Sequence, residues 1–160
     1  MTARSNYIQN APTLFKKFQD FSLAIKAGHA VSATILGLVD IRASQLNGCA
    51  FCLDMHVKET KLRGERELRL YHVAIWRESP LFDAREKAAL AWTETLTHLA
   101  KEGVSDEAYA AACKHFSEQE LAELTFSIMA INGWNRLNAA FRNPPGSADA
   151  LFGLDKAGLH

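Results

Sequence analysis

Two cysteines and one histidine lie close together near the middle of the first half of this 160-residue chain. Cys49 and Cys52 are separated by two residues, and His56 follows four residues after Cys52. Residues three and four apart share one face of an α-helix, so a helix here would bring both sulfurs and the imidazole to the same side. Two thiols at this spacing can form a disulfide with little chain movement, and an imidazole can accept a thiol proton. The segment therefore carries the minimum set of groups for dithiol redox chemistry.

Two features of the sequence would favour the thiolate, which is the only form of cysteine that attacks a peroxide or a disulfide. A free thiol has a pKa of about 8.5 and is therefore mostly protonated at neutral pH. Gly48 predicts that Cys49 lies at a helix start, where unpaired backbone N–H groups favour negative charge. His56 lies one turn beyond Cys52 and can accept its proton directly or through a water. This spacing makes Cys52 the better nucleophile, and Cys49 would then close the disulfide, which a separate reductant must reopen.

Other functions of the same segment must be weighed. A structural zinc site normally needs four ligands, and this segment supplies three; His98 or His115 could be the fourth, although no spacing favours either. Haem attachment would need a histidine directly after the second cysteine, where Leu53 stands instead. A thioredoxin-like motif would follow a strand in an α/β chain, and this sequence shows no strand signal before Cys49. Spacing alone leaves three interpretations open: redox catalysis, a metal site, or a chance meeting of these side chains on a packed helix.

The pattern of apolar residues and helix caps predicts an all-α chain. Strand signals are nearly absent, because no alternating run reaches the length of a typical strand. Two capping boxes, Asp83 with Glu86 and Ser117 with Glu120, predict helix starts. We expect a single domain over residues 1–160 with six to seven helices, at about 13–26, 31–46, 49–63, 66–77, 83–101, 105–115 and 117–142.

The last part of the predicted domain is a short tail. The helical core is expected to span about residues 15–142, and residues 143–160 follow it as a small, polar segment with a few apolar side chains. Two alternatives remain for this tail: it is disordered, or it packs onto a neighbouring subunit.

Composition limits the class of protein. Apolar residues make up 48% and charged residues 22%, as in ordinary soluble globular proteins. The 18 basic and 18 acidic side chains balance, which argues against a nucleic-acid partner. The longest apolar stretch, residues 33–39, is too short to cross a bilayer, so we expect no membrane association. We expect a cytoplasmic protein in a reducing compartment, where a Cys-x-x-Cys is more often catalytic or metal-binding than a structural link.

The run IRASQLNGCAFCLDMH at residues 41–56 resembles the core of the AhpD-like alkylhydroperoxidases, within the carboxymuconolactone decarboxylase superfamily. The resemblance continues through residues 69–71, 74–79 and 85–94 and covers roughly residues 15 to 142.

This resemblance implies an all-helical fold that assembles into trimers or hexamers. It implies a peroxidatic role for Cys52, a resolving role for Cys49 and a proton-relay role for His56. It also implies reduction by a dithiol partner, such as a lipoylated protein. We expect neither a metal nor a bound cofactor.

One position departs from the family pattern. Family members carry a glutamate twelve residues before the first cysteine as part of the proton relay, and this chain has Gly37 there. Asp40 lies one turn later near the same helical face and is a candidate substitute, although it could equally be a solvated surface residue. Glu78, Glu86 or Glu94 could also reach the site from another helix or subunit. A glycine inside a helix costs up to about 1 kcal/mol relative to alanine, which predicts a close helix approach or pocket space at Gly37.

Several residues outside the motif also carry a prediction. Tyr71, His72 and Trp76 lie at helical spacing and are interpreted mainly as core, with a substrate pocket as the alternative. Cys113 is interpreted as a small core hydrophobe, and Trp134 as a packing residue.

The function predicted from the sequence is a thiol peroxidase that reduces organic hydroperoxides or hydrogen peroxide through a Cys49–Cys52 disulfide cycle. The first alternative is a lyase of the decarboxylase branch that acts on a lactone by proton transfer, a reaction that needs no paired thiols. The second alternative is a redox sensor without enzymatic activity, in which the disulfide acts as a switch.

Overall fold

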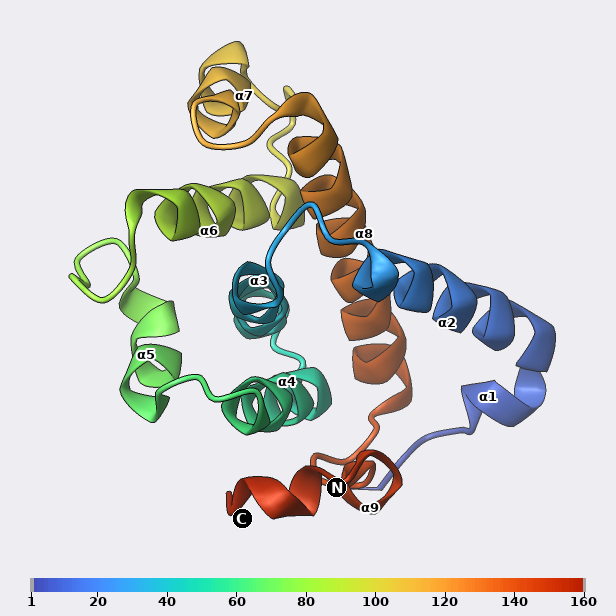
Figure 1. Ribbon diagram of the computed structural model, residues 1–160. Helices are drawn as coiled ribbons and strands as arrows, with labels where there is room; N and C mark the ends of the chain where they lie inside the picture. Colours follow the sequence, from blue (N-terminus) through green and yellow to red (C-terminus); the bar gives the residue numbers. More distant parts are fainter. Residues whose placement is uncertain (1, 160) are drawn as a thin grey trace.

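The fold is built from helices alone, as the sequence predicted. The computed structural model describes residues 2–159, and no β-strand occurs in that range (Figure 1). Within these residues nine α-helices are formed: α1 (Tyr7–Asn10), α2 (Pro12–Ala27), α3 (Ala33–Leu46), α4 (Ala50–Leu62), α5 (Glu67–His72), α6 (Ala84–Thr97), α7 (Asp106–Cys113), α8 (Glu118–Phe141) and α9 (Asp149–Phe152). Two short 3₁₀ helices, η1 (Val73–Ile75) and η2 (Leu154–Ala157), follow α5 and α9. None of the helices over residues 2–159 is long and apolar enough to span a membrane.

Helix α3 lies at the centre of the molecule. Figure 1 shows it end-on, with α4, α6 and α8 around it. Its side chains are apolar on more than one face: Ile35 and Val39 pack toward α6 and α8, whereas Leu38 and Ile41 pack toward α5 and η1. A helix that is apolar around most of its circumference is stable only where other helices cover it, so these neighbours fix the position of α3.

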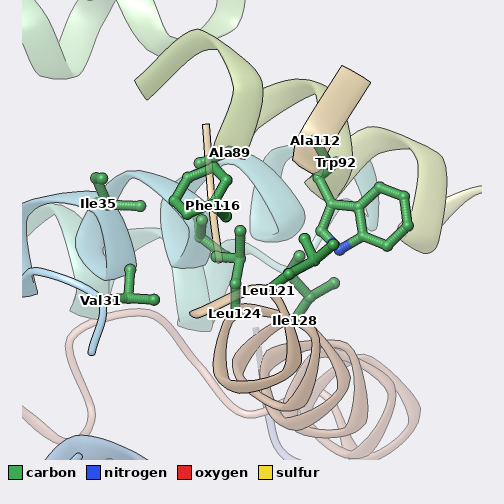
Figure 2. Close-up of a cluster of buried hydrophobic side chains, with 10 residues drawn as sticks. Val31, Ile35, Ala89, Trp92, Ala112, Phe116, Leu121, Leu124 and Ile128 are labelled. Carbon is green, nitrogen blue, oxygen red and sulfur yellow. The ribbon is translucent and has the colours of Figure 1, made fainter. Parts of the chain in front are cut away.

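The larger apolar cluster joins α3, α6, α7 and α8. In Figure 2, Trp92 of α6 lies beside Leu121 and Ile128 of α8, and Phe116 comes from the turn after α7. The two predicted capping boxes, at Asp83 and at Ser117, are both formed and start α6 and α8. These local signals and the apolar pattern together account for the long helices.

Residues 66–77 differ from the single helix that the sequence predicted. The α-helix ends at His72 and continues as the 3₁₀ helix η1. The buried stripe is Leu70, Val73 and Trp76, so Trp76 is core as expected, but Tyr71 is 64% exposed and the core prediction for it is wrong. His72 is half-buried, and its Nδ1 lies 3.0 Å from Ser79 Oγ. A short apolar-rich segment offers two candidate faces, and only its packing against Phe82 and Leu90 selects one.

The prediction for Cys113 is also wrong, because this thiol is exposed at the end of α7. The short helix buries Ala112 instead, one residue earlier. Helix α7 has only 8 residues, so its pattern of apolar residues is too short to predict which side of the helix faces α6.

The tail packs against α4 of its own chain, so the first of the two alternatives, a disordered tail, is wrong over the described residues. His160 lies outside them. Leu154 and Ala157 of η2 are both buried, and Figure 1 shows this segment beside α4. Lys58 of α4 is buried and its Nζ lies 2.6 Å from Asp149 and 2.9 Å from Asp54. Because a buried ammonium is costly unless it is paired, this cluster holds the tail on α4.

At Gly37, α3 and α4 approach each other closely. A Cβ atom added there would lie 2.8 Å from Thr60 Oγ1 and 3.1 Å from Thr60 Cγ2. Thr60 is buried and β-branched, so it has little freedom to move away. The predicted close helix approach is confirmed, and the space where a side chain at residue 37 would project is occupied by α4.

We expect Gly37→Ala to lower the free energy of unfolding. Overpacking against Thr60 costs about 1–3 kcal/mol and outweighs the roughly 1 kcal/mol that alanine gains over glycine inside a helix. Combined with Thr60→Ala, which removes both nearest atoms, the same substitution should become stabilising. Chemical denaturation of the four proteins of this double-mutant cycle measures the change of sign; a Gly37→Ala effect that is the same in both backgrounds would contradict the steric explanation.

Candidate active site

The two cysteines of the motif lie at the start of α4 and form a disulfide. Cys49 is the N-cap residue, and its Sγ accepts a hydrogen bond from the backbone N–H of Cys52 at 3.3 Å. Both cysteines are buried, beside Ala43 and Ile131. The predicted position of Cys49 at a helix start is confirmed, and the N–H groups there favour a negatively charged sulfur.

The turn that presents Cys49 is held by a row of asparagines on α8. Asn47 Nδ2 donates hydrogen bonds to Asn132 Oδ1 and to Asn135 Oδ1, both at 2.9 Å. Asn135, which is fully buried, donates through its Nδ2 to Ser44 Oγ at 3.1 Å. Buried amides without partners would be costly, so these bonds favour a single conformation of the turn between α3 and α4.

A third asparagine of α8 contacts the sulfur itself. Asn138 Nδ2 lies 3.6 Å from Cys52 Sγ, and Asn138 Oδ1 accepts hydrogen bonds from Tyr7 Oη at 3.2 Å and Asn143 Nδ2 at 2.7 Å. Burial raises the pKa of Tyr7, which keeps its phenol protonated as a donor. The sequence analysis missed this row. Asn132, Asn135 and Asn138 recur every three residues inside an apolar helix, and that spacing was a signal of a polar stripe.

His56 lies one turn beyond Cys52 on α4 and is only 6% exposed. Its Nδ1 lies 3.2 Å from Glu59 Oε2 and 3.6 Å from Asp40 Oδ2. The Asp40 side chain is 16% exposed, so its interpretation as a solvated surface residue is wrong. Asp40 is therefore the residue that brings a carboxylate from α3 to the imidazole.

The other candidate glutamates serve elsewhere. Glu86 forms an ion pair with Arg69 Nη2 at 2.5 Å, and Glu94 accepts from Arg42 Nη2 at 2.6 Å. Glu78 is exposed after η1. None of the three contacts His56 in the described part of this chain.

Glu59 is another site residue that was not predicted from the sequence. It lies three residues after His56, a spacing that predicts a contact on a helix. Its Oε1 lies 2.9 Å from Lys26 Nζ of α2 and 2.5 Å from Arg63 Nη2. Burial alone would raise the pKa of Glu59, but the hydrogen bond with His56 and the attraction of Lys26 outweigh it and hold the pKa well below its ordinary value.

Asp40 has the opposite electrostatic behaviour. Burial raises its pKa, and the attraction of His56 and of Lys26 offsets only part of that effect. Two carboxyl groups with different environments therefore face the same nitrogen of one imidazole: Glu59 is ionised and doubly paired, whereas Asp40 has a greater tendency to keep its proton.

A cavity of about 1210 Å³ opens onto these groups. Cys52, His56 and Asp40 all contribute to its wall, together with apolar side chains that include Phe15, Phe51, Met55, Ile131 and Trp134. Trp134 also packs, as expected, since its ring lies 4.5 Å from that of Phe18 between centroids. The size suits a small organic molecule, and most of the wall is apolar.

Metal ligands are not gathered in this region. Among residues 2–159 no group of three or more histidine, cysteine, aspartate or glutamate side chains is arranged to hold a metal ion. The arrangement supplies instead two sulfurs that link to each other, an imidazole and two carboxyl groups beside one cavity.

The sequence from α2 into α6 places the chain among known proteins. The model of the carboxymuconolactone decarboxylase family matches residues 12–95. The chain belongs to this family. The uncharacterized protein YdfG of Bacillus subtilis is 36% identical over 143 residues, which span 89% of this chain and 97% of YdfG.

Solved structures agree with this membership. ATU0492 of Agrobacterium tumefaciens, a protein of unknown function that has been suggested to be the antioxidant defence protein AhpD, is 36% identical. Its fold matches with a TM-score of 0.86 over 90% of this chain and 98% of ATU0492. The debrominase Bmp8 shares the fold with a TM-score of 0.78 at 18% identity, over 94% of this chain and 80% of Bmp8. The AhpD-like fold that the sequence predicted is therefore confirmed.

We expect Glu59→Gln to destabilise the protein at neutral pH by about 1–2 kcal/mol, because it removes a partly exposed charged hydrogen bond to His56 and two ion pairs. The pKa of Glu59 is lowered in the folded protein, so its stabilising effect is present above its ordinary value of 4.5 and is lost as the pH falls below it. Unfolding free energies of the wild type and the variant should therefore converge in acid.

The matched control is Glu102→Gln, at an exposed loop position. It should change stability little at any pH. A Glu59→Gln difference that stays constant from neutral to acidic pH would contradict the ion-pair explanation.

Proposed function

We propose that this protein is a thiol peroxidase that reduces organic hydroperoxides or hydrogen peroxide. The observation that carries the proposal is a buried Cys49–Cys52 disulfide beside His56, at the wall of an apolar cavity. Family membership supports an enzyme with this fold, and the dithiol distinguishes redox chemistry from the proton transfer of a lactone decarboxylase, which needs no paired sulfurs.

Cys52 is the peroxidatic cysteine in this proposal. The cavity wall includes Cys52 but not Cys49, so a substrate in the cavity meets Cys52. In the reduced protein, His56 accepts the Cys52 proton, and Asn138 Nδ2, which lies 3.6 Å from Cys52 Sγ, stabilises the thiolate. The thiolate attacks the distal peroxide oxygen, an S–O bond forms as the O–O bond breaks, and an alcohol or water leaves.

Cys49 is the resolving cysteine. Its sulfur lies at bonding distance from Cys52 in this structure, so its attack on the sulfenic acid of Cys52 needs little rearrangement. Water leaves and the disulfide forms. A dithiol reductant, of which a lipoylated protein is one example, then reduces the disulfide to two thiols by thiol–disulfide exchange.

The same proposal includes a cytoplasmic location for the enzyme and a homo-oligomer, either a trimer or a hexamer. The debrominase comparison shows that the fold alone does not select one reaction, so the dithiol chemistry must be tested directly.

We expect Cys52→Ser to abolish consumption of cumene hydroperoxide in steady-state assays with dihydrolipoamide as the reductant. The serine hydroxyl is too weak a nucleophile to replace the thiolate. Cys113→Ser is the matched control, because that thiol is exposed at the end of α7 and should leave turnover unchanged. Retained activity in Cys52→Ser would overturn the assignment, and a single round of oxidation without turnover in the wild type would favour the redox sensor.

We expect Cys49→Ser to stop the cycle after the first step. Without a resolving thiol, the sulfenic acid on Cys52 persists and can be trapped with dimedone. Mass spectrometry of the peroxide-treated variant should locate one adduct on Cys52, whereas the wild type should show the Cys49–Cys52 disulfide. A dimedone adduct on Cys49 in the Cys52→Ser variant, together with no adduct in the Cys49→Ser variant, would mean that the two cysteines have the opposite roles.

A further inference from the structure

The structure places two carboxyl groups at one imidazole nitrogen, and their surroundings differ. Glu59 Oε1 is bound by Lys26 of α2 and Arg63 at the end of α4, and its other oxygen faces His56 Nδ1 at 3.2 Å. Asp40 has no lysine or arginine within ion-pair distance in the described part of the chain, and its partner is His56 Nδ1 at 3.6 Å. Asp40 also forms part of the cavity wall.

Glu59 is arranged to position His56 rather than to react. A carboxylate that accepts a hydrogen bond from Nδ1–H leaves Nε2 of the same ring as the free acceptor. Cys52 lies one turn earlier on the same face of α4, and both side chains line the cavity. Nε2 is therefore the nitrogen that is available to take the thiol proton. Two cations hold Glu59 as an anion, and it can then stabilise the imidazolium that forms when His56 takes up the thiol proton.

Asp40 is arranged for a different task. It is mostly buried, no lysine or arginine of residues 2–159 forms an ion pair with it, and it reaches the cavity in which a peroxide would bind. Burial raises its pKa even though His56 and Lys26, and more weakly Arg63, oppose that shift, while Glu59 adds to it. A carboxyl group that can keep its proton in a cavity is suited to act as a general acid.

We propose, on the basis of the peroxidase function above, that Asp40 donates the proton that the leaving alkoxide needs, while Glu59 is the positioning residue of His56. This chain has Gly37 and no carboxyl group at the expected relay position, and Thr60 occupies the space beside it. The acid therefore comes from Asp40, one turn later on α3.

The proton balance of the step is complete. The Cys52 thiol gives its proton to His56, and the thiolate attacks the distal oxygen of the hydroperoxide. The S–O bond forms and the O–O bond breaks, so that the alkoxide leaves with the electron pair of the O–O bond. The alkoxide takes the proton of Asp40, which leaves an Asp40 carboxylate beside the His56 imidazolium, 3.6 Å away, so that the charges balance. The thiol and the hydroperoxide have become a sulfenic acid and an alcohol.

The leaving group gives a direct test. Cumene hydroperoxide releases an alkoxide, which needs a proton, whereas peracetic acid releases acetate, which does not. The rate of oxidation of Cys52 in pre-reduced, full-length protein is measured with each peroxide by stopped-flow fluorescence, without any reductant present.

We expect Asp40→Asn to slow the reaction with cumene hydroperoxide by about 100-fold or more, the usual effect of a general acid, and to change the reaction with peracetic acid far less. Asp40→Glu should recover part of the loss. Glu59→Gln should slow both peroxides by the same factor, because it acts on thiolate formation. Asp20→Asn, which removes a carboxylate from the exposed surface of α2, should leave both rates unchanged.

The pH dependence of the wild type is a second measurement that needs no variant. The ratio of the cumene hydroperoxide rate to the peracetic acid rate should fall as the pH rises through the raised pKa of Asp40, because Asp40 then loses its proton. The ratio should be independent of pH in Asp40→Asn. Asp40→Asn should also melt at a temperature no lower than the wild type at neutral pH, because ionisation of a buried aspartate with a raised pKa disfavours the folded state.

Two outcomes are distinguishable. If Asp40→Asn slows both peroxides equally, or neither, the proton-donor role is overturned while the peroxidase function stands. If wild-type Cys52 reacts with neither peroxide, the proposed function itself is overturned, and the role of Asp40 with it.

Discussion

The close packing of α3 against α4 is the constraint on which the candidate site depends. Gly37 allows Thr60 to approach within a distance that no side chain at residue 37 would permit. With the helices this close, Asp40 of α3 lies against His56 of α4, and the short turn between the helices presents Cys49 at the first N–H groups of α4. The sulfurs, the imidazole and both carboxyl groups that face it are therefore positioned by a single helix pair.

Helix α8 stabilises this pair through polar contacts rather than through apolar ones alone. Its buried asparagines bind the turn before Cys49 and reach the sulfur of Cys52. Amides buried in this way must be fully hydrogen-bonded, so they disfavour alternative positions of the turn more strongly than leucine side chains would. The same row connects the site to Tyr7 and Asn143, which lie near opposite ends of the chain.

The electrostatics of the site follow from which cations reach which carboxyl group. Lys26 and Arg63 both bind Glu59, so this carboxylate stays ionised even though it is partly buried. Over the described residues Asp40 has only the imidazole within ion-pair distance, and the cost of its burial outweighs the more distant attraction of Lys26. Two residues of similar chemistry thus acquire different protonation behaviour, and the difference arises from neighbours on α2 and α4 rather than from the residues themselves.

The sequence by itself determined the helical class, the capped starts of α6 and α8, and the pairing of Cys49 with Cys52, because each depends on residues close together in the chain. It also predicted Asp40 as a candidate beside His56, but could not choose between Asp40 and the more distant glutamates. Tertiary structure decided that choice, the exposed positions of Tyr71 and Cys113, and the packing of the tail onto α4. These features depend on contacts between segments far apart in sequence, whose energies no local pattern of residues records.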